Sequence, residues 1–130
     1  MKISGKFEVT VKPMDPYAKG SEGNSLGRMS INKVFYGDLS GESRGEMLSA
    51  MTPVKGSAGY VAIEQVAGTL GGKRGTFVLQ HFGTMKKGED FLILEVVPDS
   101  GTGELVGLSG KMSIQVDGGV HYYDFEYQLD

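Results

Sequence analysis

Residues 59–85, GYVAIEQVAGTLGGKRGTFVLQHFGTM, decide the fold because they contain two β-strands and the turn between them. Apolar and polar residues alternate on both sides of Gly71-Gly72, which is the period of a strand. A Gly-Gly pair accepts the positive φ angles of a two-residue hairpin turn. With this turn, Leu70 pairs with Lys73 and the two strands run antiparallel.

The two-residue turn sorts the side chains of this hairpin onto two faces. One face then holds Tyr60, Ala62, Glu64, Val66, Phe77, Leu79 and His81, and the other holds Val61, Ile63, Gln65, Val78, Gln80 and Phe82. Both faces are mostly apolar, which predicts cover on both sides: a barrel lumen on one, and a partner subunit or a loop on the other. A three-residue loop would instead place Glu64 beside Gln80, so the register stays open at this point.

Strand-like alternation recurs along most of the chain, as in KFEVTVK at 6–12 and KMSIQVD at 111–117. A second glycine pair, Gly118-Gly119, predicts a hairpin that joins residues 111–117 to residues 120–127. No segment shows the period of an amphipathic helix. We therefore predict an all-β fold, a closed eight-stranded antiparallel meander β-barrel forming a single domain over residues 1–130.

Composition excludes several classes of protein and site. The chain has no cysteine, so it has neither disulfides nor thiolate metal ligands, and its two histidines are far apart in sequence, which argues against zinc. A net charge of −3 gives no electrostatic reason to expect nucleic acid as a partner. No apolar run has the length of a membrane span. We expect a cytoplasmic protein without cofactors and without a membrane partner.

A second hairpin, in residues 28–51, carries a pair of opposite charges. If Ser40-Gly41 is its two-residue turn, Phe35 lies opposite Glu46, and Lys33 shares a face with Glu46. A buried ion pair there would mark a functional lumen, because burial of charges is costly without compensation. The alternative is that both side chains reach solvent at the open end of the barrel.

The register of residues 59–85 makes Glu64 and His81 diagonal neighbours on one face. A carboxylate beside an imidazole orients the ring, which is how a general base is built, and also how a buried histidine is simply satisfied. Both interpretations stay open. Tyr60 and Tyr123 are expected to line the interior with their hydroxyl groups as polar handles. The Gly- and Pro-rich residues 14–26 form a long loop, either a lid or a mobile crossing.

Several segments together resemble a known family. GDLSGESRGEML, residues 56–85, VVPDSGTGELVGLSGKMSI and HYYDFEY are similar to an uncharacterised family of small bacterial proteins with an allene oxide cyclase-like, calycin-like barrel. GTGELVGLSG is more distantly similar to allene oxide cyclases and plant dirigent proteins. The resemblance implies a closed eight-stranded barrel and a homo-oligomer, a dimer or a trimer. It implies no reaction, and no catalytic residue of the plant enzymes matches a position here.

Three hypotheses for function follow. The first is binding of a small, largely apolar molecule in the barrel lumen, oriented by Lys33, Glu46, Glu64, His81, Tyr60 and Tyr123. The second is an isomerase or cyclase in which Glu64 assists His81 as base. The third is a purely structural or interaction barrel with a filled interior.

Overall fold

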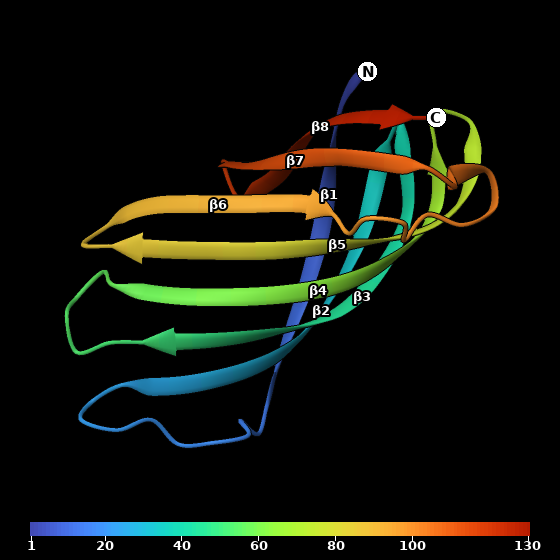
Figure 1. The fold of residues 1–130 in the computed structure, drawn as a ribbon. Helices are drawn as coiled ribbons and strands as arrows, with labels where there is room; N and C mark the ends of the chain where they lie inside the picture. The colour runs from blue at the N-terminus through green and yellow to red at the C-terminus, as the bar shows by residue number, and fades with distance from the viewer.

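A computed structural model describes all residues 1–130, and it is a closed barrel in which each strand pairs with the next and β8 returns to β1 (Figure 1). All the neighbouring strands are antiparallel. The predicted all-β, eight-stranded meander barrel is therefore confirmed. The strands are β1 (Lys2–Met14), β2 (Ser25–Gly37), β3 (Leu39–Met51), β4 (Ala58–Leu70), β5 (Lys73–Lys86), β6 (Glu89–Val96), β7 (Leu108–Asp117) and β8 (Val120–Leu129).

The single helical element is a short 3-10 turn, η1 (Gly103–Leu105). No helix in the structure is long and apolar enough to cross a membrane.

The two glycine pairs form the turns that the sequence predicts. Gly71 and Gly72 have φ angles of 57° and 84°, and Gly118 and Gly119 have 58° and 80°. These left-handed angles are those of a type I′ turn, which matches the twist of the flanking strands. Leu70 consequently pairs with Lys73, which confirms the two-residue register of the β4–β5 hairpin.

The predicted turn at Ser40-Gly41 is wrong. β2 ends at Gly37, whose φ of 111° favours glycine, and the chain reverses at Asp38. Phe35 therefore pairs with Gly41, where the prediction had Glu46. The partner moves from position 46 to position 41, an odd number of residues, and an odd shift turns every side chain of β3 to the opposite face.

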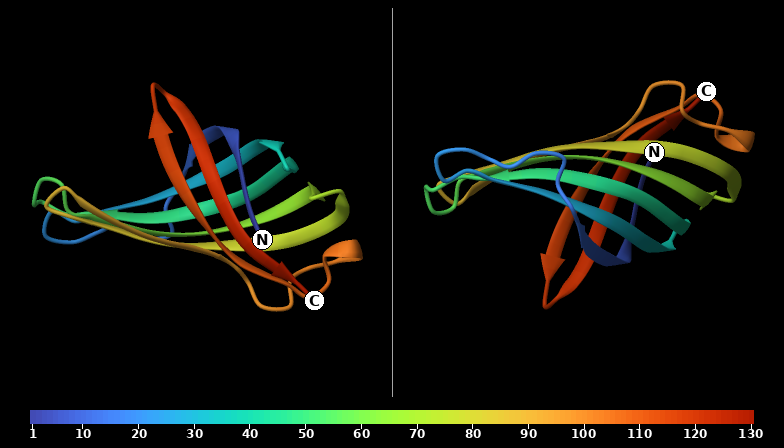
Figure 2. Two further views of the ribbon diagram at one scale, coloured as in Figure 1. Left: turned by 90° about the horizontal axis from the view of Figure 1, so that it is seen from above. Right: turned by 90° about the horizontal axis from the view of Figure 1, so that it is seen from below.

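The barrel wall is uneven around its circumference. β2 to β6 run side by side as a broad wall, and β7 and β8 cross it at an angle (Figures 1 and 2). β6 and β7 are joined by a single residue pairing, Glu95 with Lys111. After β6 the chain stays beside β5 through side-chain hydrogen bonds to the β5 backbone. Val78 N donates to Ser100 Oγ at 3.0 Å, and Arg74 N donates to a Glu104 carboxylate oxygen at 3.0 Å.

Large apolar side chains fill the half of the interior that lies near η1. Phe77 and Phe125 stack with ring centroids 6.1 Å apart, and Leu105 of η1 is fully buried. The remaining members of this core are Phe7, Phe35, Leu39, Val66, Leu70, Leu79, Leu94, Val96, Leu108, Met112, Tyr123 and Tyr127. This half has the dense packing of an ordinary protein core.

Candidate functional site

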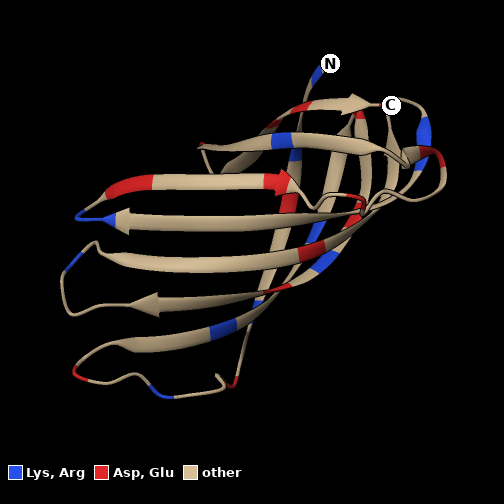
Figure 3. Cartoon of the chain, in the orientation of Figure 1, with Lys and Arg blue, Asp and Glu red and all other residues tan.

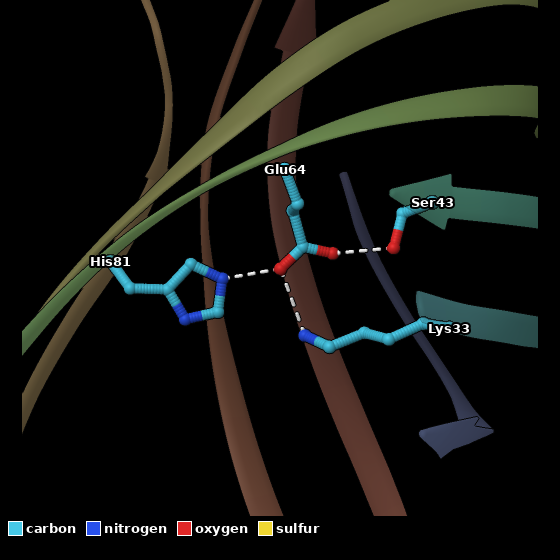
Figure 4. Close-up of polar contacts among 4 residues, drawn as sticks. All are labelled: Lys33, Ser43, Glu64 and His81. Atoms are coloured by element: carbon cyan, nitrogen blue, oxygen red, sulfur yellow. Dashed lines mark hydrogen bonds and ion pairs between the residues drawn. The ribbon is translucent and has the colours of Figure 1, made fainter. Parts of the chain in front are cut away.

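Four polar residues meet inside the barrel, each from a different strand: Lys33 on β2, Ser43 on β3, Glu64 on β4 and His81 on β5 (Figure 4). All four side chains are buried, and Glu64 is fully inaccessible. Charged residues are rarely buried unless they are paired. These four are the buried polar or charged residues of the chain. The free-energy cost of burying polar groups is therefore concentrated at one place in the barrel.

The Glu64 carboxylate is the centre of this cluster. Lys33 Nζ lies 2.9 Å from Oε2, and Ser43 Oγ donates to Oε1 at 2.8 Å. His81 Nε2 contacts the same Oε2 that Lys33 binds (Figure 4). Both carboxylate oxygens are therefore satisfied, by one hydroxyl, one ammonium and one imidazole nitrogen.

Glu64 is ionised over the ordinary range of pH. Burial by itself raises the pKa of this carboxyl, but the hydrogen bond with His81 and the charge of Lys33 outweigh burial and lower the pKa to about 2. An ionised carboxylate only accepts hydrogen bonds, so His81 Nε2 must carry the proton that it shares with Glu64. With its proton on Nε2, a neutral imidazole has its lone pair at Nδ1.

Two atoms of the cluster retain hydrogen-bonding capacity. Lys33 Nζ makes one hydrogen bond within the protein, although an ammonium has three donors. His81 bonds through Nε2, and every fully buried side-chain nitrogen or oxygen has a partner, so the unbonded Nδ1 is not sealed inside the protein. Lys33 Nζ also lies 4.8 Å from the centroid of the Phe7 ring, a cation–π contact that holds the ammonium in place.

The local sequence leaves room for the Glu64 side chain. Gly45 on β3 pairs with Glu64 across the sheet. A Cβ atom at Gly45 would lie 2.7 Å from Glu64 Cα and 2.8 Å from Glu64 Cβ, closer than side-chain atoms approach. The glycine therefore lets β3 and β4 come together with the carboxylate directed inward between them.

The cluster lies where the filled core gives way to an open, apolar half. Inward-facing positions are successively less covered toward the loop end of β3, β4 and β5: Ala62 is buried, Tyr60 is half-buried, and Met51 and Met85 are 63% and 40% exposed. Residue pairing places Met51, Ala58 and Met85 in one row and Ser49, Tyr60 and Gly83 in the next. The inner face between solvent and His81 is thus mostly apolar and rich in methionine, and Asp90 of β6, which pairs with Met85, adds a carboxylate at its solvent edge.

The predicted site residues separate into three groups. Lys33, Glu64 and His81 come together as described, and the diagonal relation predicted for Glu64 and His81 is confirmed. The predicted Lys33–Glu46 relation is wrong, because β3 turns Glu46 to the outer face. There its carboxylate accepts a hydrogen bond from Arg28 Nε at 2.7 Å, which lowers the pKa of Glu46.

The two tyrosines have different surroundings. Tyr60 lies on the approach to the cluster, with its ring centroid 6.4 Å from that of His81, and burial raises the pKa of its hydroxyl. The Tyr123 hydroxyl accepts a hydrogen bond from Leu39 N and lies within hydrogen-bond distance of the carbonyl of Tyr36. Tyr123 is therefore committed to the backbone where β2 turns into β3, apart from the Glu64 cluster.

Ser43 is the functional candidate that the sequence predictions missed. It pairs with Lys33 across β2 and β3, so both side chains point inward. The misplaced turn at Ser40-Gly41 had assigned this position to the outer face. The signal in the sequence was Gly37-Asp38, a glycine followed by an aspartate directly after an alternating run, which is a turn signature.

No group of three or more histidine, cysteine, aspartate or glutamate side chains is arranged to hold a metal ion. The cluster offers a ligand the unused N–H donors of one ammonium and the accepting Nδ1 of one imidazole, beside an ionised carboxylate. Such a set suits a ligand oxygen that accepts hydrogen bonds, or a proton transfer at Nδ1.

Comparison with known proteins places the chain in a family. A family model described as a protein of unknown function, DUF3224, matches residues 3–127. A crystal structure of a DUF3224 protein of unknown function from Shewanella oneidensis MR-1 superposes with a TM-score of 0.97 at 56% identity. That match covers 100% of this chain and 98% of the other chain. No curated protein matches, and the more distant resemblance to allene oxide cyclases stays a prediction. The chain therefore belongs to the DUF3224 family of proteins of unknown function.

Proposed function

We propose that the open half of the barrel binds a small, largely apolar molecule whose polar group reaches the Lys33–Glu64–His81 cluster. The observation that carries this proposal is the position of the cluster, buried at the inner end of an apolar face that opens to solvent at Met51 and Met85. Ligand sites in proteins combine a mostly apolar lining with a few placed polar groups. The arrangement here has that composition.

The chemistry of the cluster specifies the polar group of the ligand. Lys33 has unused N–H donors, and the Glu64 carboxylate already has three partners. A ligand oxygen that accepts hydrogen bonds, such as a carbonyl, carboxylate or sulfonate oxygen, fits Lys33 Nζ. A cationic head group does not, because it would face the ammonium without access to the carboxylate.

Two dyes that share an apolar body test this proposal by fluorescence titration. 8-Anilinonaphthalene-1-sulfonate carries a sulfonate, whereas N-phenyl-1-naphthylamine is neutral. Replacement of Lys33 by methionine is expected to raise the dissociation constant of the sulfonate dye at least about tenfold. The dissociation constant of the neutral dye should rise less than about threefold. Met85→Asp, which puts a charge on the inner face, is expected to weaken both dyes.

The matched control is Phe82→Glu, on the outer face of the same strand, since Phe82 is 49% exposed there. It should leave lumen binding unchanged, and far-ultraviolet circular dichroism should show that all three variants are folded. Dye binding that Phe82→Glu abolishes, and that Lys33→Met and Met85→Asp leave unchanged, would place the dyes outside the barrel and contradict the proposal.

The contact between Glu64 and His81 favours a second function, removal of a proton from the bound molecule. Glu64 fixes the proton on Nε2, so Nδ1 is the basic atom of the ring. In D₂O, Nδ1 would take a proton from a carbon next to a carbonyl group, and that carbon would then receive deuterium. 2-Tetralone, an apolar ketone with such protons, serves as the probe in proton NMR. Exchange by the wild type that His81→Gln abolishes supports this function, and exchange no faster than in buffer contradicts it.

A further inference from the structure

The outer face of the broad wall carries a row of exposed apolar side chains. Four of them form one continuous row across the strands, each paired with the next: Leu48 on β3, Val61 on β4, Phe82 on β5 and Ile93 on β6. Their exposed fractions are 51%, 48%, 49% and 41%. Two more exposed apolar residues, Ile63 and Phe91, lie in the adjacent rows. Solitary exposed apolar residues are normal, whereas a contiguous patch marks an interaction site.

No part of the chain covers this row. An open groove of about 650 Å³ runs over Leu48, Val61, Ile63 and Phe82. Tyr17, from the loop between β1 and β2, reaches the margin of the groove, but its side chain is 100% exposed and so leaves the apolar row uncovered. The occupant must come from outside this barrel.

Charges of opposite sign lie at the two ends of the row. Arg28 on β2 pairs with Leu48 at one end, and Glu95 on β6 is two residues from Ile93 at the other. Figure 3 shows this distribution, with basic ribbon on β2, acidic ribbon at both ends of β6 and mostly uncharged ribbon between them. Arg28 bonds Glu46 through Nε, which leaves its two terminal nitrogens free, and Glu95 takes part in no ion pair.

We propose that a second copy of this chain docks on this face, related by a two-fold axis that runs along β4 in the plane of the interface. This rotation places β2 of one copy over β6 of the other, so the free guanidinium nitrogens of Arg28 meet Glu95 of the partner subunit on both sides of the axis. A two-fold axis perpendicular to the strands would bring Arg28 onto Arg28 of the partner subunit, which is repulsive.

The proposed interface has the composition of known ones. Its centre, at Val61 and Phe82, is apolar, and its charged residues are the Arg28–Glu46 pair on the β2–β3 side and Glu95 on the β6 side. Each copy uses the same patch, as closed two-fold dimers do. The two outer walls would pack as two sheets face to face, about 10 Å apart.

Analytical ultracentrifugation over a concentration series tests the proposal on the full chain. The wild type is expected to dimerise, and Phe82→Glu is expected to raise the dimer dissociation constant at least about tenfold by placing a charge at the centre of the interface. The matched control is Tyr122→Glu, another exposed aromatic residue of the barrel wall, on β8 and outside the patch. It should leave the dissociation constant unchanged.

Charge reversal tests the orientation of the two copies. Arg28→Glu and Glu95→Arg should each weaken the dimer, and the double variant should recover most of the wild-type affinity, because each contact between the two subunits is restored with its signs exchanged. A wild type that stays monomeric at every concentration overturns the proposal, as does a trimer. A dimer that Phe82→Glu leaves intact, or that neither charge reversal weakens, also overturns it.

Discussion

The two halves of the barrel interior differ sharply, although the same strands build both. Near η1, inward positions of β4 and β5 hold Val66 and Phe77, which are fully buried against Phe125 and Leu105. Toward the other end of the same two strands, inward positions hold Tyr60, Gly83 and Met85, and Met85 is 40% exposed. The alternation of side chains is unchanged, so what differs is the cover over the inner face: β8 pairs with β1 only over Lys2–Phe7, and β7 pairs with β6 only at Glu95.

The buried charges lie at the border between these halves. Glu64 is two residues from Val66 on β4, and His81 is two residues from Leu79 on β5. A charged group deeper in the filled core could not contact a ligand. A charged group nearer the open end would be solvated, like most surface charges. The filled half of the barrel therefore holds the polar cluster rigidly in place. The open half gives a ligand access to that cluster.

Truncation of one large residue in each half should show the difference in packing. Phe77→Ala should destabilise the fold by about 3–5 kcal/mol, because a cavity remains in a fully buried site. Met85→Ala should cost less than about 1 kcal/mol, since its side chain is partly in water. Urea unfolding followed by circular dichroism measures both. Equal losses would show that the two halves are packed alike.

Removal of the Glu64 carboxylate tests how much the buried charge pair at this border contributes to stability. Glu64→Leu should cost about 3 kcal/mol or more, because the Lys33 ammonium stays buried without its counter-charge. The double variant Lys33→Met with Glu64→Leu should regain much of this loss in the same unfolding experiment. If the double variant is no more stable than the single one, the loss comes from packing and the charge pair is not its cause.

Acid should weaken the fold through Glu64. The pKa of this carboxyl is about 2 in the folded protein and near its ordinary value of 4.5 when unfolded. A lowered folded-state pKa contributes stability that is fully present above the unfolded value and is lost as the pH falls toward 2. Between pH 7 and pH 3 this one group should lose about 2 kcal/mol.

The matched variant for this measurement is Glu64→Gln, which has no carboxyl at this position. The difference between wild type and variant in unfolding free energy should shrink by that amount as the pH is lowered, while the other carboxylates titrate equally in both. A difference that is independent of pH would show that Glu64 has an ordinary pKa in the fold.

Much of the site follows from the sequence wherever a turn can be recognised. Gly71-Gly72 sets the register of β4 and β5, and with it the neighbourhood of Glu64 and His81. The same reasoning failed one hairpin earlier, because Ser40-Gly41 resembles a turn but continues as strand. A Cβ at Gly41 would lie 2.8 Å from Gly68 Cα, so this glycine serves close strand packing and not chain reversal.

The sequence by itself determined the strands, their alternation and the two Gly-Gly hairpins, because these depend on residues near one another in the chain. The tertiary structure alone decided that Lys33 and Ser43 join Glu64 and that Glu46 does not. Lys33 reaches Glu64 across two successive strand pairings, and an error in either register moves it to the other face. Where the interior stays open was likewise decided in three dimensions, because it depends on which strands extend to that end of the barrel and pair there.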